Sequence, residues 1–190
     1  MVSRAEHRRA TLLQISAATT EAFEELGPRA TFDDVAQRAG LSRRTLFRYV
    51  ETREDLLFIH PVLWFEIFDE AIAEVADQSL RERLLHAARH LSAHIDADPE
   101  PVRRAMAVAT ADPALMRGYA NVSRRWTERI AAEVRGEACD PEAVFRAGVL
   151  GAAIMAVIDA ALNEWFVSEP SPQLENLVER GLDYLAPIIE

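Results

Sequence analysis

The sequence predicts an all-α protein of about nine helices, and three observations support this fold class. No alternating run of Val, Ile and Thr marks a β-strand, and no Asn-Gly or Asp-Gly pair marks a hairpin. Glycine is scarce, with 7 among 190 residues. Because proline has no backbone N–H to leave unpaired, it suits the first position of a helix. Four prolines directly follow good helix-capping residues, which are Asp98, Asp112, Asp140 and Ser171.

Capping signals also place the helices of the N-terminal part. Thr31, Ser42 and Thr52 are expected N-caps, and each of the two threonines precedes an Asp by three residues, as in a capping box. Pro61 falls inside the fourth helix, which predicts a kink there or two abutting helices. The expected helices span residues 4–26, 32–39, 43–49, 53–76, 79–96, 99–109, 113–135, 141–167 and 172–188.

Charge is distributed unevenly along the chain. All 21 basic residues are Arg, and the formal net charge is -10. Residues 1–60 hold nine Arg against nine acidic residues, so the rest of the chain carries the whole negative charge. An asymmetry of this kind indicates that the N-terminal part contacts a polyanion.

The composition is that of a globular protein in a reducing compartment. Cys139 is the one cysteine, so no internal disulfide can form. No N-terminal segment combines a basic stretch with an apolar run, as a signal peptide does. The uncharged apolar stretch between Arg146 and Asp159 is shorter than the ~20 residues of a membrane span. We therefore expect a cytoplasmic protein with no membrane partner.

Residues 30–57, ATFDDVAQRAGLSRRTLFRYVETREDLL, have the pattern of a helix-turn-helix. Gly40 is expected to end the first short helix in a left-handed conformation, and Ser42 to cap the second. Leu46 and Val50 share one side of the second helix and would pack it inward. Arginine forks fit phosphates and the guanine edge, and an aromatic ring fits a sugar or a thymine methyl. The opposite side carries such groups: Arg43, Arg44, Phe47 and Arg48.

A wider resemblance favours DNA binding over a merely solvated Arg-rich helix face. Residues 10–57 closely resemble the N-terminal domain of the tetracycline-repressor (TetR) family of transcription regulators. The matching segments are AATTEAFEELGPRATFDDVAQRAGLSRRTLFRYV and the ETREDLL that follows it. Two positions depart from the family pattern, since Val50 stands where Phe is common and Arg53 where Lys is common.

The resemblance implies an all-helical homodimer that binds a palindromic operator in double-stranded DNA. In each chain, a three-helix helix-turn-helix domain over residues 1–52 would precede a larger helical bundle for ligand binding and dimerisation over residues 53–190. The residues expected to face bases or phosphates are Arg43, Arg44, Thr45, Phe47 and Arg48. Those expected to hold the DNA backbone are Thr31, Tyr49 and Arg53, and Ser42 joins the set as the cap of the recognition helix.

The last two predicted helices are candidates for a dimer interface. The helix over residues 143–167 carries a stripe of small residues four positions apart, namely Gly148, Ala152, Ala156 and Ala160. The final helix offers a larger apolar stripe that includes Leu174, Val178, Leu182 and Leu185. The resemblance implies that these helices form a four-helix interface between protomers. The alternative is that both are core helices of one subunit.

The ligand pocket is less defined, because apolar helical stripes are more often plain core than ligand sites. We name as candidate lining Phe68, Leu91, Met106, Tyr119, Trp126 and Met155. The expected effector is a small hydrophobic or amphipathic molecule. The segment TADPALMRGYANVSRRWTERIAAEVRG is faintly similar to a TetR subgroup thought to sense acyl-CoA-like molecules.

Three histidines repeat at every fourth position on one helix, namely His86, His90 and His94. A pair with this spacing can chelate a transition metal, but three span about 12 Å, which is too far for one ion. We interpret them as residues at the edge of an apolar face and predict no metal and no cofactor. A sensing role for these histidines or for Cys139 stays open.

The leading hypothesis for function is a ligand-controlled transcription factor. Its favoured form is a repressor that leaves its operator when the effector binds. An enzyme is disfavoured because the sequence lacks G-x-S-x-G, a P-loop, H-E-x-x-H and a Gly-rich dinucleotide turn. A helical scaffold that contacts protein instead of DNA is the other alternative. Salt separates the two, since counterion release makes DNA binding weaken steeply as salt rises.

Overall fold

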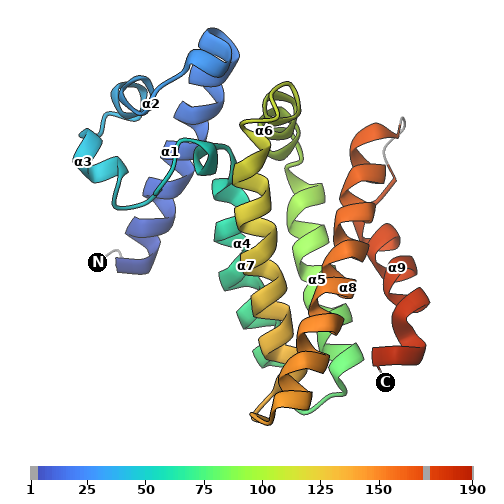
Figure 1. Ribbon diagram of the computed structural model, residues 1–190. Coiled ribbons are helices and arrows are strands. Elements are labelled where there is room, and N and C mark those ends of the chain that lie inside the picture. Colours follow the sequence, from blue (N-terminus) through green and yellow to red (C-terminus); the bar gives the residue numbers. More distant parts are fainter. Residues whose placement is uncertain (1–3, 169–171, 190) are drawn as a thin grey trace. The chain divides into compact units, whose positions relative to one another are not determined.

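The computed structural model describes residues 4–168 and 172–189, and the regular elements in these ranges are all helices (Figure 1). This confirms the all-α class and the expected number of α-helices for the described part of the chain. In chain order they are α1 (Arg4–Leu26), α2 (Phe32–Arg38), α3 (Arg43–Leu46), α4 (Ile59–Glu74), α5 (Leu80–Ala97), α6 (Glu100–Thr110), α7 (Met116–Arg135), α8 (Pro141–Val167) and α9 (Leu174–Ile189). Two 3₁₀ helices accompany them, η1 (Gly27–Arg29) and η2 (Glu54–Phe58).

The chain forms two compact units. The first unit combines Met1–Trp64 with Pro99–Val122, and the second combines Phe65–Asp98 with Ser123–Glu190. Helix α6 and the start of α7 therefore group with the N-terminal helices. The division into functional domains at residue 52 does not coincide with these units and stays a prediction.

Helix α1 is the centre of the first unit and packs against α2, η1, η2 and α6. Large apolar side chains of α1, α2 and α3 are at most 1% exposed, namely Leu12, Ile15, Phe23, Val35 and Leu46. Each such side chain contributes about 1.5–3 kcal/mol when buried. Gly118 on α7 also belongs to this unit, because a Cβ there would overlap the carbonyl of Glu54 in η2.

In the second unit α9 packs against both α5 and α8, and α8 and α9 run in opposite directions (Figure 1). Asp96 near the end of α5 ties these helices together. Its carboxylate accepts a bond from the Trp165 indole N–H at 3.1 Å and another from the backbone N–H of Leu174 at 3.2 Å. It therefore caps the start of α9 from a different helix.

The four proline-based helix starts have different outcomes. Asp140 caps α8 as expected, because its side chain accepts from the N–H of Ala143 at 2.9 Å. Asp98 makes no cap bond, and Pro99 precedes the first residue of α6. Asp112 instead accepts from the N–H of Ala114 at 2.8 Å, so a turn precedes α7 and the expected start at residue 113 is wrong. Ser171 lies outside the described residues.

The predicted helix 53–76 is divided in two. Thr52 and Asp55 exchange backbone-to-side-chain bonds of 3.2 Å, as in a capping box, and η2 follows. Helix α4 then begins at Ile59, so Pro61 lies in its first turn. Backbone N–H groups in the first turn of a helix have no intrahelical acceptor, so proline breaks no hydrogen bond there. This confirms the expectation of two abutting helices.

Candidate nucleic-acid interface and effector pocket

The turn between α2 and α3 is built from local signals. Thr31 and Asp34 form a complete capping box at the start of α2. Gly40 has φ +60°, and the N–H of Leu41 donates to the carbonyl of Ala36 at 2.9 Å across the end of α2. Only glycine adopts this backbone without strain, so Gly40 sets the direction in which the chain enters α3.

Helix α3 is held inward by two apolar side chains. Leu46 is fully buried and Val50 is 5% exposed, as their spacing predicts. Ser42 caps the helix by accepting from the N–H of Thr45 at 3.1 Å. The N–H groups of Arg48 and Tyr49 bond to carbonyls three residues back, so the α-helix is shorter than the expected 43–49, although the turns continue to Val50.

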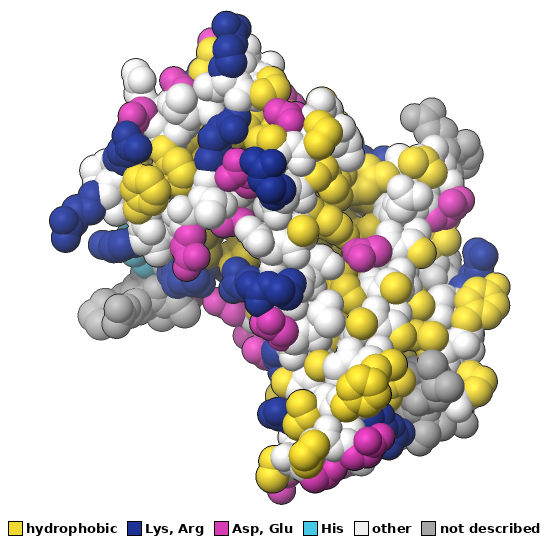
Figure 2. All heavy atoms as spheres, in the orientation of Figure 1, with side chains coloured by type: hydrophobic (Ala, Val, Ile, Leu, Met, Phe, Trp, Pro, Cys, Tyr) yellow, Lys and Arg dark blue, Asp and Glu magenta, His cyan; other side chains and the backbone are white. Residues whose placement is uncertain are grey.

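The outward side of α3, the α3 face, consists of Arg43, Arg44, Phe47 and Arg48, all of which are exposed. Phe47 is 44% exposed and stacks on Phe32 with ring centroids 4.4 Å apart. The Arg43 guanidinium lies over the Phe47 ring and pairs with Asp33 at 3.0 Å. Arg44 has no charged or hydrogen-bonded partner among the described residues. Figure 2 shows arginine side chains gathered around hydrophobic atoms on this part of the surface.

The other residues predicted for DNA contact differ in how much of their polar capacity is already used. Thr31 is exposed at the start of α2, and Thr45 and Tyr49 are half-buried beside the α3 face. Arg53 donates to the carbonyl of Ala30 at 2.7 Å and to that of Pro28, and its guanidinium lies over the ring of Phe23. Arg53 therefore fastens the segment after α3 onto α1, and its contact with DNA stays a prediction.

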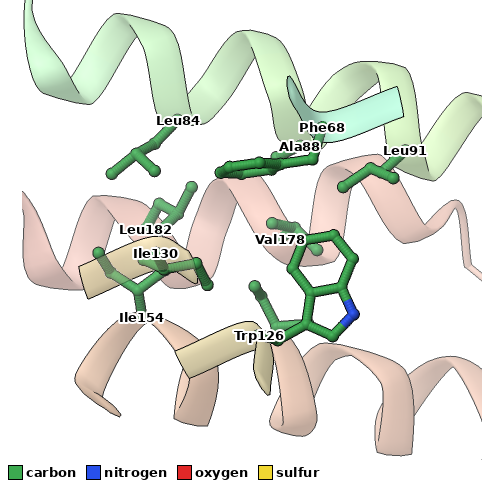
Figure 3. Close-up of a pocket in the computed structure, with 10 residues that line it drawn as sticks. Phe68, Leu84, Ala88, Leu91, Trp126, Ile130, Ile154, Val178 and Leu182 are labelled. Atoms are coloured by element: carbon green, nitrogen blue, oxygen red, sulfur yellow. The ribbon is translucent and has the colours of Figure 1, made fainter. Parts of the chain in front are cut away.

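An apolar pocket lies inside the second unit (Figure 3). Its volume is about 40 Å³, and side chains from α4, α5, α7, α8 and α9 close around it. Trp126 forms part of the wall and is fixed by two rings, since it stacks on Phe65 at 4.3 Å and meets Phe68 edge-on at 5.5 Å. The lining residues are Phe68, Leu84, Ala88, Leu91, Trp126, Ile130, Ile154, Ile158, Val178 and Leu182.

Half of the predicted ligand residues belong to this pocket, namely Phe68, Leu91 and Trp126. Met155 is buried on α8 but does not line it. Met106 and Tyr119 do not line this pocket and belong to the first unit, where the Tyr119 ring lies 5.6 Å from that of Phe58, so their contact with a ligand stays a prediction. The stripe on α7 passes from one unit into the other, and sequence periodicity does not show where that change occurs.

The predicted small stripe on α8 is exposed along its whole length, at Gly148, Ala152, Ala156 and Ala160. Phe145 and Val149 extend this α8 face and are 69% and 52% exposed. The whole of α8 is long and apolar enough to cross a membrane by length and composition. Its uncharged stretch between Arg146 and Asp159, on which the sequence prediction was based, is shorter than a membrane span. Only 28% of its apolar window is buried in the subunit, and hydrophobic atoms are prominent along it in Figure 2.

The predicted contribution of α9 to the interface requires correction. Leu174, Val178 and Leu182 are at most 5% exposed in a single subunit, and the last two line the pocket. Side chains that are already buried offer no surface to a second copy. Leu185 is half-buried and remains in the predicted interface.

Comparison with known families accounts for both parts of the chain. A model described as "Bacterial regulatory proteins, tetR family" matches residues 15–58. A model described as "MftR C-terminal domain" matches residues 78–190, which is more than half of the chain. The chain belongs to the TetR family. Members of this family are soluble DNA-binding transcription regulators and typically are not enzymes. A search of the curated proteins gives no match.

Solved structures with the TetR fold cover nearly the whole chain. FadR from Thermus thermophilus, a TetR-family transcriptional repressor in complex with lauroyl-CoA, is 20% identical with a TM-score of 0.61, over 92% of this chain and 93% of that one. A putative TetR-family regulator from Rhodococcus sp. is 18% identical with a TM-score of 0.53, over 95% and 98%. FadR from Bacillus halodurans, a fatty acid degradation regulator, is 16% identical with a TM-score of 0.51, over 93% and 98%.

Two features of this TetR-family chain escaped sequence reasoning. Gly151 is the glycine of α8 that permits a close approach, since a Cβ there would lie 2.9 Å from that of Ala131 on α7, whereas Gly148 faces open space. Glu74 lies beside His86 and His90, although it stands on another helix. A buried glycine and a cross-helix contact have no local sequence signal, because both depend on which helix packs alongside.

Proposed function

We propose that this TetR-family protein is a cytoplasmic, ligand-responsive repressor that binds a palindromic operator as a homodimer. The observation that carries the proposal is the α3 face, where three exposed arginines share one side of the helix with an aromatic ring that is already stacked on α2. Two copies of this face would enter successive major grooves, about 34 Å apart on the duplex.

The α3 face supports DNA binding because Phe47 and Arg43 are held in place before DNA arrives. The Phe32–Phe47 stack and the Asp33–Arg43 ion pair restrict the side chains that would otherwise lose freedom on binding. Arg44 is exposed and has no described partner in the chain, so its guanidinium is available to phosphate or to the guanine edge. On binding DNA, the Arg43 guanidinium would leave Asp33 for a phosphate, or would contact both groups at once.

The decisive experiment is a salt titration of binding to duplex DNA from the region upstream of the protein's own gene. Wild-type protein should lose affinity steeply and linearly on a log–log plot as salt rises, because bound arginines release counterions. Arg44→Ala should weaken binding about tenfold or more and flatten the slope by roughly one unit. Arg135→Ala, at an exposed position of the second unit, is the matched control and should change neither. Salt-independent binding, or equal effects of both variants, contradicts the proposal.

The α8 face supports homodimerisation. A small-residue stripe lets two helices approach closely, and Phe145 and Val149 at its end are large apolar side chains that a lone subunit would leave in water. A two-fold axis would place the α8 face of one protomer against the α8 face of the other, so the same residues would be buried in both protomers. Residue Leu185 on α9 would contribute at the edge.

The pocket of the second unit supports an effector with an apolar tail. Its lining is apolar, and FadR from Thermus thermophilus, which shares the fold, is described in complex with lauroyl-CoA. We propose an acyl-CoA thioester or a similar amphipathic molecule as the effector. A volume of about 40 Å³ does not hold an acyl chain, so entry requires displacement of lining side chains, and the effector would then favour the conformation that fits DNA poorly.

Filling the pocket tests the effector separately from DNA binding. In calorimetric titrations with acyl-CoA thioesters of increasing chain length, affinity should rise with chain length until the pocket is full. Ala88→Leu should weaken this binding at least tenfold and leave operator affinity in the absence of thioester unchanged, because Ala88 lines the pocket and the α3 face lies in the other unit. Ala132→Leu, at an exposed position of α7, is the control.

A further inference from the structure

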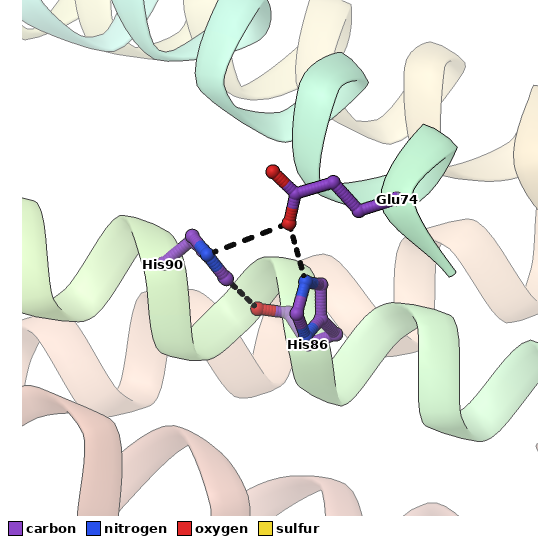
Figure 4. Close-up of side chains that lie close together, drawn as sticks. All are labelled: Glu74, His86 and His90. Atoms are coloured by element: carbon purple, nitrogen blue, oxygen red, sulfur yellow. Dashed lines mark hydrogen bonds and ion pairs between the residues drawn. The ribbon is translucent and has the colours of Figure 1, made fainter. Parts of the chain in front are cut away.

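Three side chains that can bind a metal meet on the surface of the second unit. Glu74 stands at the end of α4, and His86 and His90 lie one turn apart on α5 (Figure 4). The Glu74 Oε2 atom is 2.9 Å from Nε2 of His86 and 3.7 Å from Nε2 of His90. One ligand atom from each of the three residues lies within 4.8 Å of the others.

The orientation of His90 suits a metal ligand. Its Nδ1 lies 3.0 Å from the backbone carbonyl of His86, which can only accept, so Nδ1 carries the proton. When Nε2 is unprotonated, its lone pair is directed toward Glu74, whose Oε2 lies 3.7 Å away. Ligating histidines in proteins are commonly fixed in this way, by a bond from the other ring nitrogen to a carbonyl. A plain Glu–His ion pair involves one imidazole, whereas here two imidazoles place Nε2 near the same carboxylate oxygen.

We propose that Glu74, His86 and His90 form a binding site for one divalent transition-metal ion such as Zn²⁺, Ni²⁺ or Co²⁺. Two imidazoles and one carboxylate favour these ions over Mg²⁺ and Ca²⁺, which take oxygen ligands. In a tetrahedral site with metal–ligand bonds of about 2.0–2.1 Å, neighbouring ligand atoms are about 3.4 Å apart. The distances of 2.9 and 3.7 Å from the Glu74 oxygen lie on either side of that value.

The site would be open and surface-exposed. The side chains of Glu74, His86 and His90 are 57%, 29% and 44% exposed, so water or a further ligand would complete the coordination. His94 stands one turn beyond His90 and lies outside the cluster. An ion bound here would join the end of α4 to the middle of α5, across the turn that links them. Binding should therefore stabilise the second unit by mass action.

The test is metal titration of the full-length chain after treatment with a chelator. Zn²⁺ should bind with one ion per chain by calorimetry and raise the thermal midpoint. Co²⁺ should give the absorption bands of a nitrogen- and oxygen-ligated ion, without the thiolate band that binding at Cys139 would add. His86→Gln and His90→Gln should each weaken binding at least tenfold and abolish the thermal shift.

His94→Gln is the matched control, because His94 is exposed on the same helix and one turn away. It should leave stoichiometry, affinity and thermal shift unchanged. Glu74→Gln should weaken binding while leaving circular dichroism unaltered. Binding that is lost equally in the His94 variant, binding that survives in the His86 and His90 variants, or a thiolate band from Cys139 in place of the expected spectrum would overturn the proposal.

Discussion

The α3 face and the α8 face of this molecule are both exposed, and we propose opposite kinds of partner for them. The α3 face carries Arg43, Arg44 and Arg48 around one ring, on a chain whose net charge is -10. The α8 face is a row of small apolar residues with hardly any charge. Attraction to a polyanion is weakened by salt, whereas apolar association is not. On this proposal, salt should weaken operator binding and leave dimerisation intact.

The contrast also extends to how each face is supported. The α3 face depends on a helix of four residues, which cannot persist alone and relies on Leu46 and on the cap at Ser42. The α8 face lies on a helix of 27 residues, whose other side is buried against its own subunit. Loss of one anchor should therefore disorganise the α3 face, while the α8 face should tolerate single changes except at its surface.

The largest effect should come from Leu46→Ala, which tests the dependence of the α3 face on its anchor. Truncating a fully buried Leu costs about 2–5 kcal/mol of folding free energy. Hydrogen exchange should show loss of protection over residues 43–50, and operator binding should fall sharply. Sedimentation should show the same oligomeric state as wild type, because the α8 face lies in the other unit.

Phe47→Ala is the matched variant on the outer side of α3. Phe47 is 44% exposed, so its removal should cost only about 1 kcal/mol of stability, chiefly the stack on Phe32. Operator affinity should fall while exchange protection is kept. If Leu46→Ala retains native protection and affinity, the proposed division between an anchoring side and a DNA-contacting side of α3 is wrong.

The next largest effect should come from Ala156→Arg, at the middle of the α8 face. An arginine buried without a partner in an apolar interface costs roughly 3 kcal/mol or more, which is about a hundredfold in dimer affinity. Sedimentation should show monomers at concentrations where wild type is dimeric. Ala132→Arg on α7 is the control, and an unchanged oligomeric state for both variants would remove the α8 face from the interface.

A smaller effect distinguishes the two sides of α8 through its glycines. At Gly151 a Cβ would lie 2.9 Å from both the Ala131 Cβ and the Thr127 carbonyl oxygen, so Gly151→Ala should cost about 1–3 kcal/mol of stability. At Gly148 a Cβ meets nothing in the subunit, so Gly148→Ala should stabilise the helix by up to about 1 kcal/mol. Urea denaturation of dilute protein measures both.

The same Gly148 variant sharpens the assignment of the α8 face. If the stripe lets two copies approach closely, a methyl group at this position should weaken dimerisation while it raises subunit stability. Opposite signs for folding and association would be difficult to obtain from any buried position. A gain in both would place Gly148 outside the contact with a second copy.

The helix-turn-helix was predictable from sequence because its signals are local. The Thr31 and Ser42 caps, the left-handed Gly40 and the inward pair of Leu46 and Val50 all lie within twenty residues, and the structure has each of them. Such features need only the chemistry of neighbouring residues. In this region the sequence prediction errs only in where helices end, since the α-helix α3 stops at Leu46 and not at residue 49.

The second unit was harder to predict because its apolar residues admit more than one assignment. Val178 and Leu182 were expected at the interface and are pocket lining, since both roles require the same apolar spacing on α9. Periodicity shows that α9 has an apolar side without showing which helix covers it. Glu74 and the two histidines illustrate the same limit, because only the packing of α4 against α5 brings them together.

The smallest predicted effect is a pH dependence at the start of α2, in the unit that carries the α3 face. Hydrogen bonds from the Thr31 side chain and backbone, at 2.6 and 2.8 Å, lower the pKa of Asp34 below its ordinary value of 3.8. A carboxyl group with a lowered pKa in the folded state stabilises above its ordinary pKa and loses that contribution as pH falls through the lowered one. Asp34→Asn should thus lower the urea midpoint at neutral pH, and the difference from wild type should shrink in acid below 3.8. Asp77→Asn, at an exposed position of the second unit, should change neither value, and a difference for Asp34→Asn that persists unchanged into acid would show that the cap does not depend on the charge of Asp34.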